Sequence, residues 1–177
     1  DVEFIAALKK HPGFINEPDA CRNEHSVQIE LPFLQYALEA FRLVPIIVGD
    51  LDAPTRTAMA KALQNLIDEH TLVVASSDFT HYGENYDYTP FTESIPENLT
   101  ALDMGAFAYI EKKDPAGFRS YVEAKDATIC GRNPIGILLG MLPDDAAVHL
   151  LHYCKSGDRT NDYNLSVSYI SAAATGK

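Results

Sequence analysis

Basic residues are scarce in this sequence. The chain of 177 residues has 14 Lys and Arg against 25 Asp and Glu, a formal net charge of −11 at pH 7. Nucleic acids and anionic membranes are bound through clustered Lys and Arg, which replace counterions. We therefore expect no nucleic-acid or membrane partner. No apolar run approaches the roughly 20 residues that span a bilayer, and the first residues resemble no signal peptide.

Cysteine is also sparse, and several catalytic signatures are missing. Cys21, Cys130 and Cys154 are widely spaced, which fits a reducing cytoplasm better than a disulfide scaffold. The sequence contains no Gly-rich phosphate loop, no G-x-S-x-G, no H-E-x-x-H and no C-x-x-C. ATPase, serine hydrolase, zincin and zinc-ribbon functions are therefore excluded.

The remaining composition is that of a globular α/β protein. Hydrophobic residues make up 46% and charged residues 22%, which argues against disorder, and the length favours a single domain over residues 1–177. Apolar runs typical of buried strands alternate with helical patterns. The strands are expected over 43–48, 71–75, 147–153 and 165–172. The helices are expected over 26–41 with a break near Pro32, from Pro54 to 67, over 99–110, from Pro115 to 122 and over 135–142.

A polar string follows the strand expected over 71–75. In open α/β sheets ligands bind beyond the carboxyl ends of strands, and residues 76–81 occupy that place. Asp78 and His81 are three residues apart, close enough for a carboxylate to orient an imidazole for acid–base chemistry. The alternative is an Asx-turn at Asp78 beside an exposed, idle His81. A long loop, expected over 82–96, follows.

A second candidate site surrounds Cys130. This residue lies just before a helix whose start is marked by Asn133 and Pro134. The positive end of that helix, with Arg132 beside it, favours thiolate over thiol. The alternative is a small buried hydrophobe, but the flanking turn residues argue against it.

A third candidate is the pair Glu24 and His25. Glu24 is placed to bind His25 or to act as an anion at the start of the following helix. The alternative is a capping cluster in which Ser26 is the N-cap.

Taken together, these motifs resemble the Memo family, whose bacterial and archaeal members are called AmmeMemoRadiSam system protein B. The family in turn resembles the class III extradiol dioxygenases, which implies a three-layer α/β/α fold with a mixed sheet. The resemblance rests on residues 24–33, 45–49, 76–83, 102–103, 128–136 and 166–169. The family's P-H-A-G-Y and S-H-H motifs are missing and the chain starts without Met, so it corresponds to the C-terminal two-thirds of a family member.

The resemblance implies a role for each candidate residue. Cys130 corresponds to a metal ligand, His81 to the acid/base residue with Asp78 beside it. Residues expected to line the pocket are Glu24, His25, Arg132 and Asn133. Iron, or copper or zinc, is expected in the complete protein and weak binding in this chain, because a lone thiolate is a weak site.

The implied function is metal-dependent redox or oxygen chemistry on a small molecule, by an enzyme of the non-haem dioxygenase type. Two alternatives stay open. One is a non-catalytic module that binds a peptide or small ligand. The other is a metal-free cysteine hydrolase with Cys130 as nucleophile, His81 as base and Asp78 as orienter.

Overall fold

The computed structural model describes every residue of the chain except 18, 21, 23 and 177. Contacts divide the chain into two compact units, Asp1–Ser76 and Ser77–Lys177, which are described one at a time. The single domain expected from the length stays a prediction. Cys21, expected to be an inert thiol, lies outside the described residues. No helix among the described residues is both long enough and apolar enough to cross a membrane.

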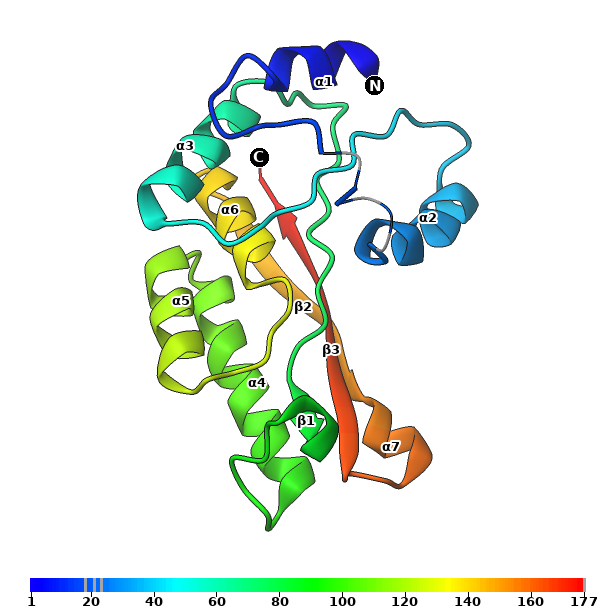
Figure 1. Ribbon diagram of the computed structural model, residues 1–177, viewed down its shortest axis with the longest axis vertical. Helices are drawn as coiled ribbons and strands as arrows, with labels where there is room; N and C mark the ends of the chain where they lie inside the picture. The colour runs from blue at the N-terminus through cyan, green and yellow to red at the C-terminus, as the bar shows by residue number, and fades with distance from the viewer. Residues whose placement is uncertain (18, 21, 23, 177) are drawn as a thin grey trace. The chain divides into compact units, whose positions relative to one another are not determined.

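The first unit contains helices α1 (Val2–Leu8), α2 (Ser26–Ala37) and α3 (Ala53–Gln64) (Figure 1). The helix expected from Pro54 is confirmed as α3. Asp52 is its N-cap, because the Asp52 carboxylate accepts a hydrogen bond of 2.8 Å from the N–H of Thr55. Met59 and Leu63 form its buried side.

The two early strands are not formed. Residues 43–48 and 71–75 are irregular, and Leu72 is 67% exposed where a buried strand was expected. An apolar run specifies that a segment prefers burial, but a strand forms only when a neighbour accepts and donates its ladder hydrogen bonds. In the part of the chain that the structure describes, neither segment has such a neighbour, so the two strands expected there are wrong.

Helix α2 begins at residue 26 as expected, but differs from its expectation in the middle and at its C-terminal end. The helix continues through Pro32 without a break and ends at Ala37. Main-chain hydrogen bonds hold both of its ends, from Ile29 N–H to the His25 carbonyl at 3.0 Å and from Leu38 N–H to the Leu34 carbonyl at 2.9 Å. The break expected near Pro32 is therefore wrong.

The second unit is built on a three-stranded antiparallel sheet (Figure 1). Its strands are β1 (His81–Gly83), β2 (Ala147–Lys155) and β3 (Leu165–Thr175), in the order β1-β3-β2. The two late strands are thus confirmed. His81 pairs with Val167 at the β1–β3 contact, and β2 pairs with β3 along most of its length.

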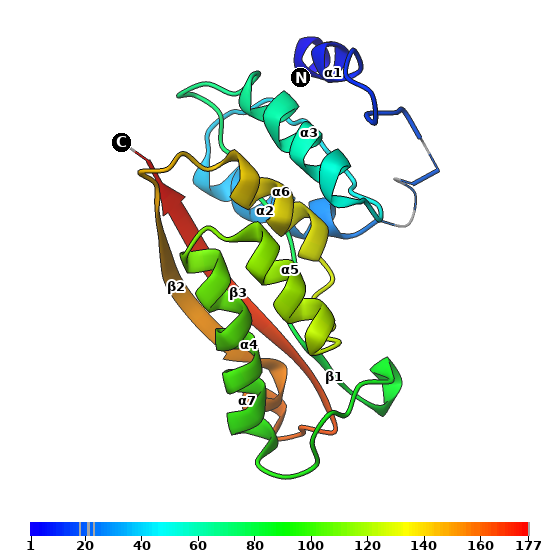
Figure 2. The same ribbon diagram turned by 90° about the vertical axis from the view of Figure 1, so that its left-hand side faces the viewer.

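Helices α4 (Ile95–Glu111), α5 (Pro115–Ala124) and α6 (Arg132–Met141) form one layer beside this sheet, as Figure 2 shows. Leu99, Phe118 and Ile129 are almost fully buried within the unit. The expected start of α5 is confirmed, since the Asp114 carboxylate accepts a hydrogen bond of 2.8 Å from the Gly117 N–H. The chain is therefore a mixed α/β protein, as predicted.

Two smaller elements complete the unit. A 3-10 helix, η1 (Glu84–Tyr86), lies within the stretch expected to be a loop, and α7 (Ser156–Thr160) joins β2 to β3. Helix α6 begins at Arg132, with Gly131 as its N-cap. The sequence placed the N-cap at Asn133, two residues after the observed cap. Asn133 is instead buried in the first turn of the helix.

Candidate functional site

The segment that carries Asp78 and His81 is held by its own backbone. The four successive N–H groups of residues 78–81 each donate to an acceptor far away in the sequence. In order, these acceptors are Cys130 Sγ at 3.2 Å, the Ser168 carbonyl at 2.8 Å, Asp103 Oδ1 at 3.3 Å and Thr128 Oγ1 at 2.8 Å. Because three of these acceptors are side-chain atoms, most of the segment lies outside the regular ladder while every donor is satisfied.

A β-bulge lies immediately before His81. The Phe79 N–H donates to the Ser168 carbonyl at 2.8 Å, and the Ser168 N–H donates to the Thr80 carbonyl at 2.9 Å. Two consecutive residues thus face one residue of β3, which is the pattern of a bulge. Bulges bend a strand and change the direction of the next side chain, and here the next side chain is His81.

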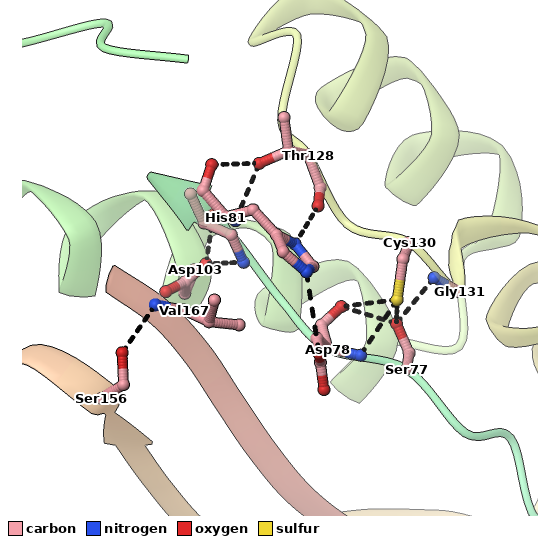
Figure 3. A network of polar contacts seen from close by, with 10 residues as sticks. Ser77, Asp78, His81, Asp103, Thr128, Cys130, Gly131, Ser156 and Val167 are labelled. Carbon is pink, nitrogen blue, oxygen red and sulfur yellow. Dashed lines mark hydrogen bonds and ion pairs between the residues drawn. The ribbon is translucent and has the colours of Figure 1, made fainter. Parts of the chain in front are cut away.

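Thr128 holds His81 at three points (Figure 3). Its hydroxyl accepts from the His81 N–H at 2.8 Å and donates to the His81 carbonyl at 2.7 Å. The Thr128 carbonyl lies 2.9 Å from Nδ1 of the ring. A carbonyl can only accept, so Nδ1 carries the ring proton of the neutral imidazole. Nε2 therefore has a free lone pair.

Asp78 and His81 are brought together as expected, with a specific orientation. Asp78 Oδ2 lies 3.6 Å from His81 Nε2, and the two side chains are 46% and 20% exposed. The sequence suggested that Asp78 orients the ring, but the structure places the orienting hydrogen bond at the Thr128 carbonyl. The Asp78 carboxylate instead faces Nε2, the ring nitrogen opposite the one that binds Thr128.

Two tyrosines flank this pair. The Tyr86 ring meets the His81 ring edge to face, with centroids 5.0 Å apart. Tyr169 lies on the same face of β3 as Val167, the partner of His81. Burial raises the pKa of Tyr169, and the negative charge of Asp78 raises it further. Both rings therefore belong to the surroundings of Asp78 and His81.

Cys130 lies on the other side of Asp78. The cysteine is exposed, so its interpretation as a buried hydrophobe is wrong. Its sulfur accepts the Asp78 N–H and lies 3.9 Å from Ser77 Oγ. Ser77 Oγ in turn accepts the Gly131 N–H at 2.8 Å, which ties residues 77–78 to the start of α6. No hydrogen bond joins Cys130 to His81 among the described residues.

The other predicted pocket residues are placed as follows. Arg132 is exposed at the first position of α6, and Asn133 is buried beside it. Glu24 and His25 belong to the first unit, at the start of α2. There the Glu24 carboxylate accepts the Ser26 N–H at 2.7 Å, and the backbone and hydroxyl hydrogen bonds of Ser26 lower the pKa of Glu24. Glu24 is therefore an anion at the start of α2, one of the two roles expected for it. The N-cap position is taken by His25, so the expected N-cap role of Ser26 is wrong.

Sequence reasoning missed four residues of the site. They are Ser77, Tyr86, Thr128 and Tyr169. Ser77 and Thr128 stand inside the motifs that carry the candidate residues, and this adjacency is the one signal that points to them. Their partners lie between 47 and 54 residues away along the chain, so no local pattern gives the pairing.

The described residues do not gather a complete ligand set for a metal ion. Among the residues that the structure describes, no three His, Cys, Asp or Glu side chains gather where they could hold a metal ion. Structural and catalytic metal sites in proteins usually take three or four protein ligands. Cys130 and His81 Nε2 are the accessible soft and imidazole donors that the site offers.

Comparison with known proteins gives a consistent result. The family described as Memo-like protein matches residues 1–173. The chain is 33% identical to Protein MEMO1 of Homo sapiens over 167 residues, which cover 86% of this chain and 56% of that protein. It is 33% identical to a MEMO1 family protein of Methanopyrus kandleri over 176 residues, 96% of this chain and 58% of that one. The chain thus spans about half the length of these relatives.

Proposed function

The chain belongs to the Memo-like family, and we propose that its second unit supplies the proton-transfer part of a site for metal-dependent redox or oxygen chemistry on a small molecule. The family has the dioxygenase-like fold that the sequence predicted. One observation carries the proposal: the hydrogen bond from Nδ1–H to the Thr128 carbonyl leaves His81 Nε2 as a free base beside a carboxylate. The proposal includes a reducing cytoplasmic location, which the free thiols of Cys130 and Cys154 support.

His81 performs the proton transfer at Nε2. The neutral imidazole accepts a proton from a ligand hydroxyl or thiol at this atom. The resulting positive charge is stabilised on both sides of the ring, by the Thr128 carbonyl at Nδ1 and by the Asp78 carboxylate 3.6 Å from Nε2. The same group returns the proton later in the reaction. The T-shaped contact with Tyr86 fixes the ring plane during both steps.

Cys130 is the ligand that this chain contributes to a metal. The described residues on their own do not fit a complete site, so the proposal requires further ligands from family sequence beyond these residues. Iron or copper, when bound, supplies electron transfer and Lewis acidity. In the chain itself, Cys130 offers an exposed sulfur that the Asp78 N–H and Ser77 hold in place.

The geometry favours this role over a cysteine hydrolase. In a hydrolase the thiol faces the free nitrogen of the histidine, and the carboxylate binds the opposite nitrogen. Here the opposite nitrogen binds the Thr128 carbonyl. Asp78 lies between Cys130 and His81: its N–H donates to the Cys130 sulfur, and its carboxylate faces His81 Nε2. The order Cys–His–Asp is therefore not assembled.

The proposal is tested on a family-length protein that contains this chain, loaded with Fe(II) or Cu(II). Metal content is measured after dialysis against a mild chelator, and oxygen uptake is measured with ascorbate as electron donor. We expect His81→Ala to retain the metal and to slow oxygen uptake by about 10²-fold or more. Cys130→Ser should lose metal and oxygen uptake together, whereas the control Cys154→Ser should lose neither.

Two outcomes contradict the proposal. Metal content and oxygen uptake that are unchanged in Cys130→Ser place the metal elsewhere. A family-length protein that retains no metal and consumes no oxygen is explained better as a binding module for a peptide or small ligand.

A further inference from the structure

A buried carboxylate that the proposed function does not use lies directly behind the site. Asp103, in the middle of α4, is completely buried. A buried carboxylate is strongly disfavoured unless hydrogen bonds replace its water. Asp103 has three such bonds. Its Oδ1 accepts from the Thr80 hydroxyl at 2.6 Å and from the Thr80 N–H at 3.3 Å, and its Oδ2 accepts from the Tyr153 hydroxyl at 2.8 Å.

Oδ1 of Asp103 replaces a hydrogen-bond acceptor that the β-bulge removes. In the bulge, the Thr80 carbonyl takes the Ser168 N–H, while the Ser168 carbonyl is used by Phe79 and not by Thr80. The Thr80 N–H has thereby lost its ladder partner, and Thr80 is fully buried. A buried N–H without an acceptor is costly. Asp103 Oδ1 supplies the acceptor.

The position of Thr80 connects this contact to the site. His81 follows Thr80 directly, and Asp78 precedes it by two residues. Thr128 binds His81 and Asp103 binds Thr80, so the two side chains hold neighbouring residues of one short segment. Figure 3 shows Asp103 close to His81, and Asp103 Oδ1 accepts from the N–H and the hydroxyl of Thr80, the residue before His81.

We propose that Asp103 is a positioning residue, whose carboxylate holds the bulge at Thr80 and thereby sets where Asp78 and His81 stand. This inference rests on the proposed function, because positioning matters only if Asp78 and His81 act. It also extends that function, since it assigns a role in the site to a residue of the core.

The alternative is that Asp103 has a purely structural role. In that case Asp103 serves to attach α4 to β2 through Tyr153, and its contact with Thr80 is incidental. Lys155 does not neutralise Asp103 in the contacts seen. Its Nζ lies 3.0 Å from Thr100 Oγ1, 3.6 Å from Asp158 Oδ2 and 5.1 Å from the centre of the Tyr153 ring. The roles of the two carboxylate oxygens can therefore be tested separately, by mutating Thr80, which binds Oδ1, and Tyr153, which binds Oδ2.

The experiment compares Thr80→Val with the matched control Tyr153→Phe in this 177-residue chain. Each variant removes one hydroxyl donor from one oxygen of Asp103. Amide hydrogen exchange and the imidazole ¹⁵N signals of His81 are measured by NMR. We expect Thr80→Val to speed exchange at the Asp78 and His81 amides at least tenfold more than at the α5 amides, and to shift the His81 ring signals. Tyr153→Phe should leave the exchange rates of these two amides, relative to the α5 amides, and the His81 ring signals unchanged.

A second pair of variants addresses the carboxylate itself. Asp103→Asn retains an oxygen that can accept from Thr80, so it should keep the wild-type His81 signals. Asp103→Ala removes both acceptor oxygens, so the His81 signals should move away from their wild-type positions. If Asp103→Ala fails to fold, the comparison of Thr80→Val with Tyr153→Phe decides alone.

The inference is overturned if Thr80→Val accelerates exchange evenly over the chain and leaves the His81 ring signals unchanged. It is equally overturned if Tyr153→Phe shifts those signals as much as Thr80→Val does. These readouts need neither metal nor turnover. Failure of the proposed function would therefore appear in metal content and oxygen uptake, and failure of the positioning role in exchange and ring signals.

Discussion

Thr128 binds the backbone N–H, the backbone carbonyl and the ring nitrogen Nδ1 of His81, and these three contacts leave Nε2 as the nitrogen that is free for the proposed proton transfer. The three hydrogen bonds measure 2.8, 2.7 and 2.9 Å. The backbone bonds fix where His81 stands, and the ring bond fixes which nitrogen carries the proton. The chemistry proposed for Asp78 and His81 depends on this relationship.

Replacing Thr128 by Val should destabilise the protein. The substitution keeps the shape of the side chain but leaves the His81 N–H and carbonyl without their partner. Loss of partners for such part-buried groups costs about 1–3 kcal/mol. Urea denaturation followed by circular dichroism measures this loss. Thr128→Ser, which keeps the hydroxyl, is the control and should stay near the wild type. A Thr128→Val variant as stable as Thr128→Ser would contradict the role of the hydroxyl.

Cys130 should be alkylated faster than Cys154. Cys130 is exposed, whereas Cys154 is half-buried on β2, so the reagent reaches the Cys130 sulfur more readily. Brief treatment with iodoacetamide followed by peptide mapping measures both rates in one sample. Cys130→Ser, which should lose the fast phase of labelling, is the control. Faster labelling of Cys154 would show that the sulfur at the site is protected.

The 177-residue chain should bind transition metals weakly and below one equivalent. Cys130 is the main ligand that it offers, and the described residues contain no group of three. Titration with Co(II) should give a sulfur-to-cobalt absorption band that is lost in Cys130→Ser and kept in Cys154→Ser. Dialysis against a mild chelator should remove the metal. Metal that stays bound at one ion per chain would mean that the ligands lie within this chain and that the assigned roles are wrong.

Tyr88 should make the protein less stable at alkaline pH. Its hydroxyl donates to the Lys125 carbonyl at 2.7 Å, and burial raises the pKa of Tyr88 to about 12, from its usual value near 10. Between these two values the unfolded chain releases the proton and the folded chain keeps it. The contribution of Tyr88 is therefore fully present below pH 10 and is lost as the pH rises towards 12.

The corresponding experiment compares the wild type with Tyr88→Phe. Urea midpoints are measured for both between pH 8 and pH 12, a range given by the two pKa values. The wild type should lose its advantage over the variant as the pH rises, because the variant has no proton to release. A difference that stays constant over this range would contradict the assignment.

The parts of this structure that could be predicted from sequence are those fixed by neighbours along the chain. Pro54 and Pro115 predicted the starts of α3 and α5, because proline favours the first turn of a helix. The structure shows the caps Asp52 and Asp114, whose carboxylates each bind an N–H three residues on. The strands at 43–48 and 71–75 were wrong, since their apolar pattern carries no information about a partner. The proximity of Asp78 to His81 was predictable from their spacing.

The positioning of the site could not be predicted in the same way. Thr128 is 47 residues from His81, and Asp103 is 23 residues from Thr80. The β-bulge at Phe79 and Thr80 depends on the register with β3, which no local pattern specifies. The sequence therefore indicated candidate residues, and the tertiary contacts determine which nitrogen of His81 binds Thr128 and which is left free for the proposed chemistry.

The most direct test of the account is the tautomer of His81. Long-range ¹H–¹⁵N correlation spectra of the imidazole, recorded above the pH at which the ring is protonated, distinguish the two nitrogens. His81→Gln identifies the signal. The account predicts a ring protonated at Nδ1 and bare at Nε2, because the Thr128 carbonyl accepts from Nδ1. A His81 ring protonated at Nε2 and bare at Nδ1 would contradict it.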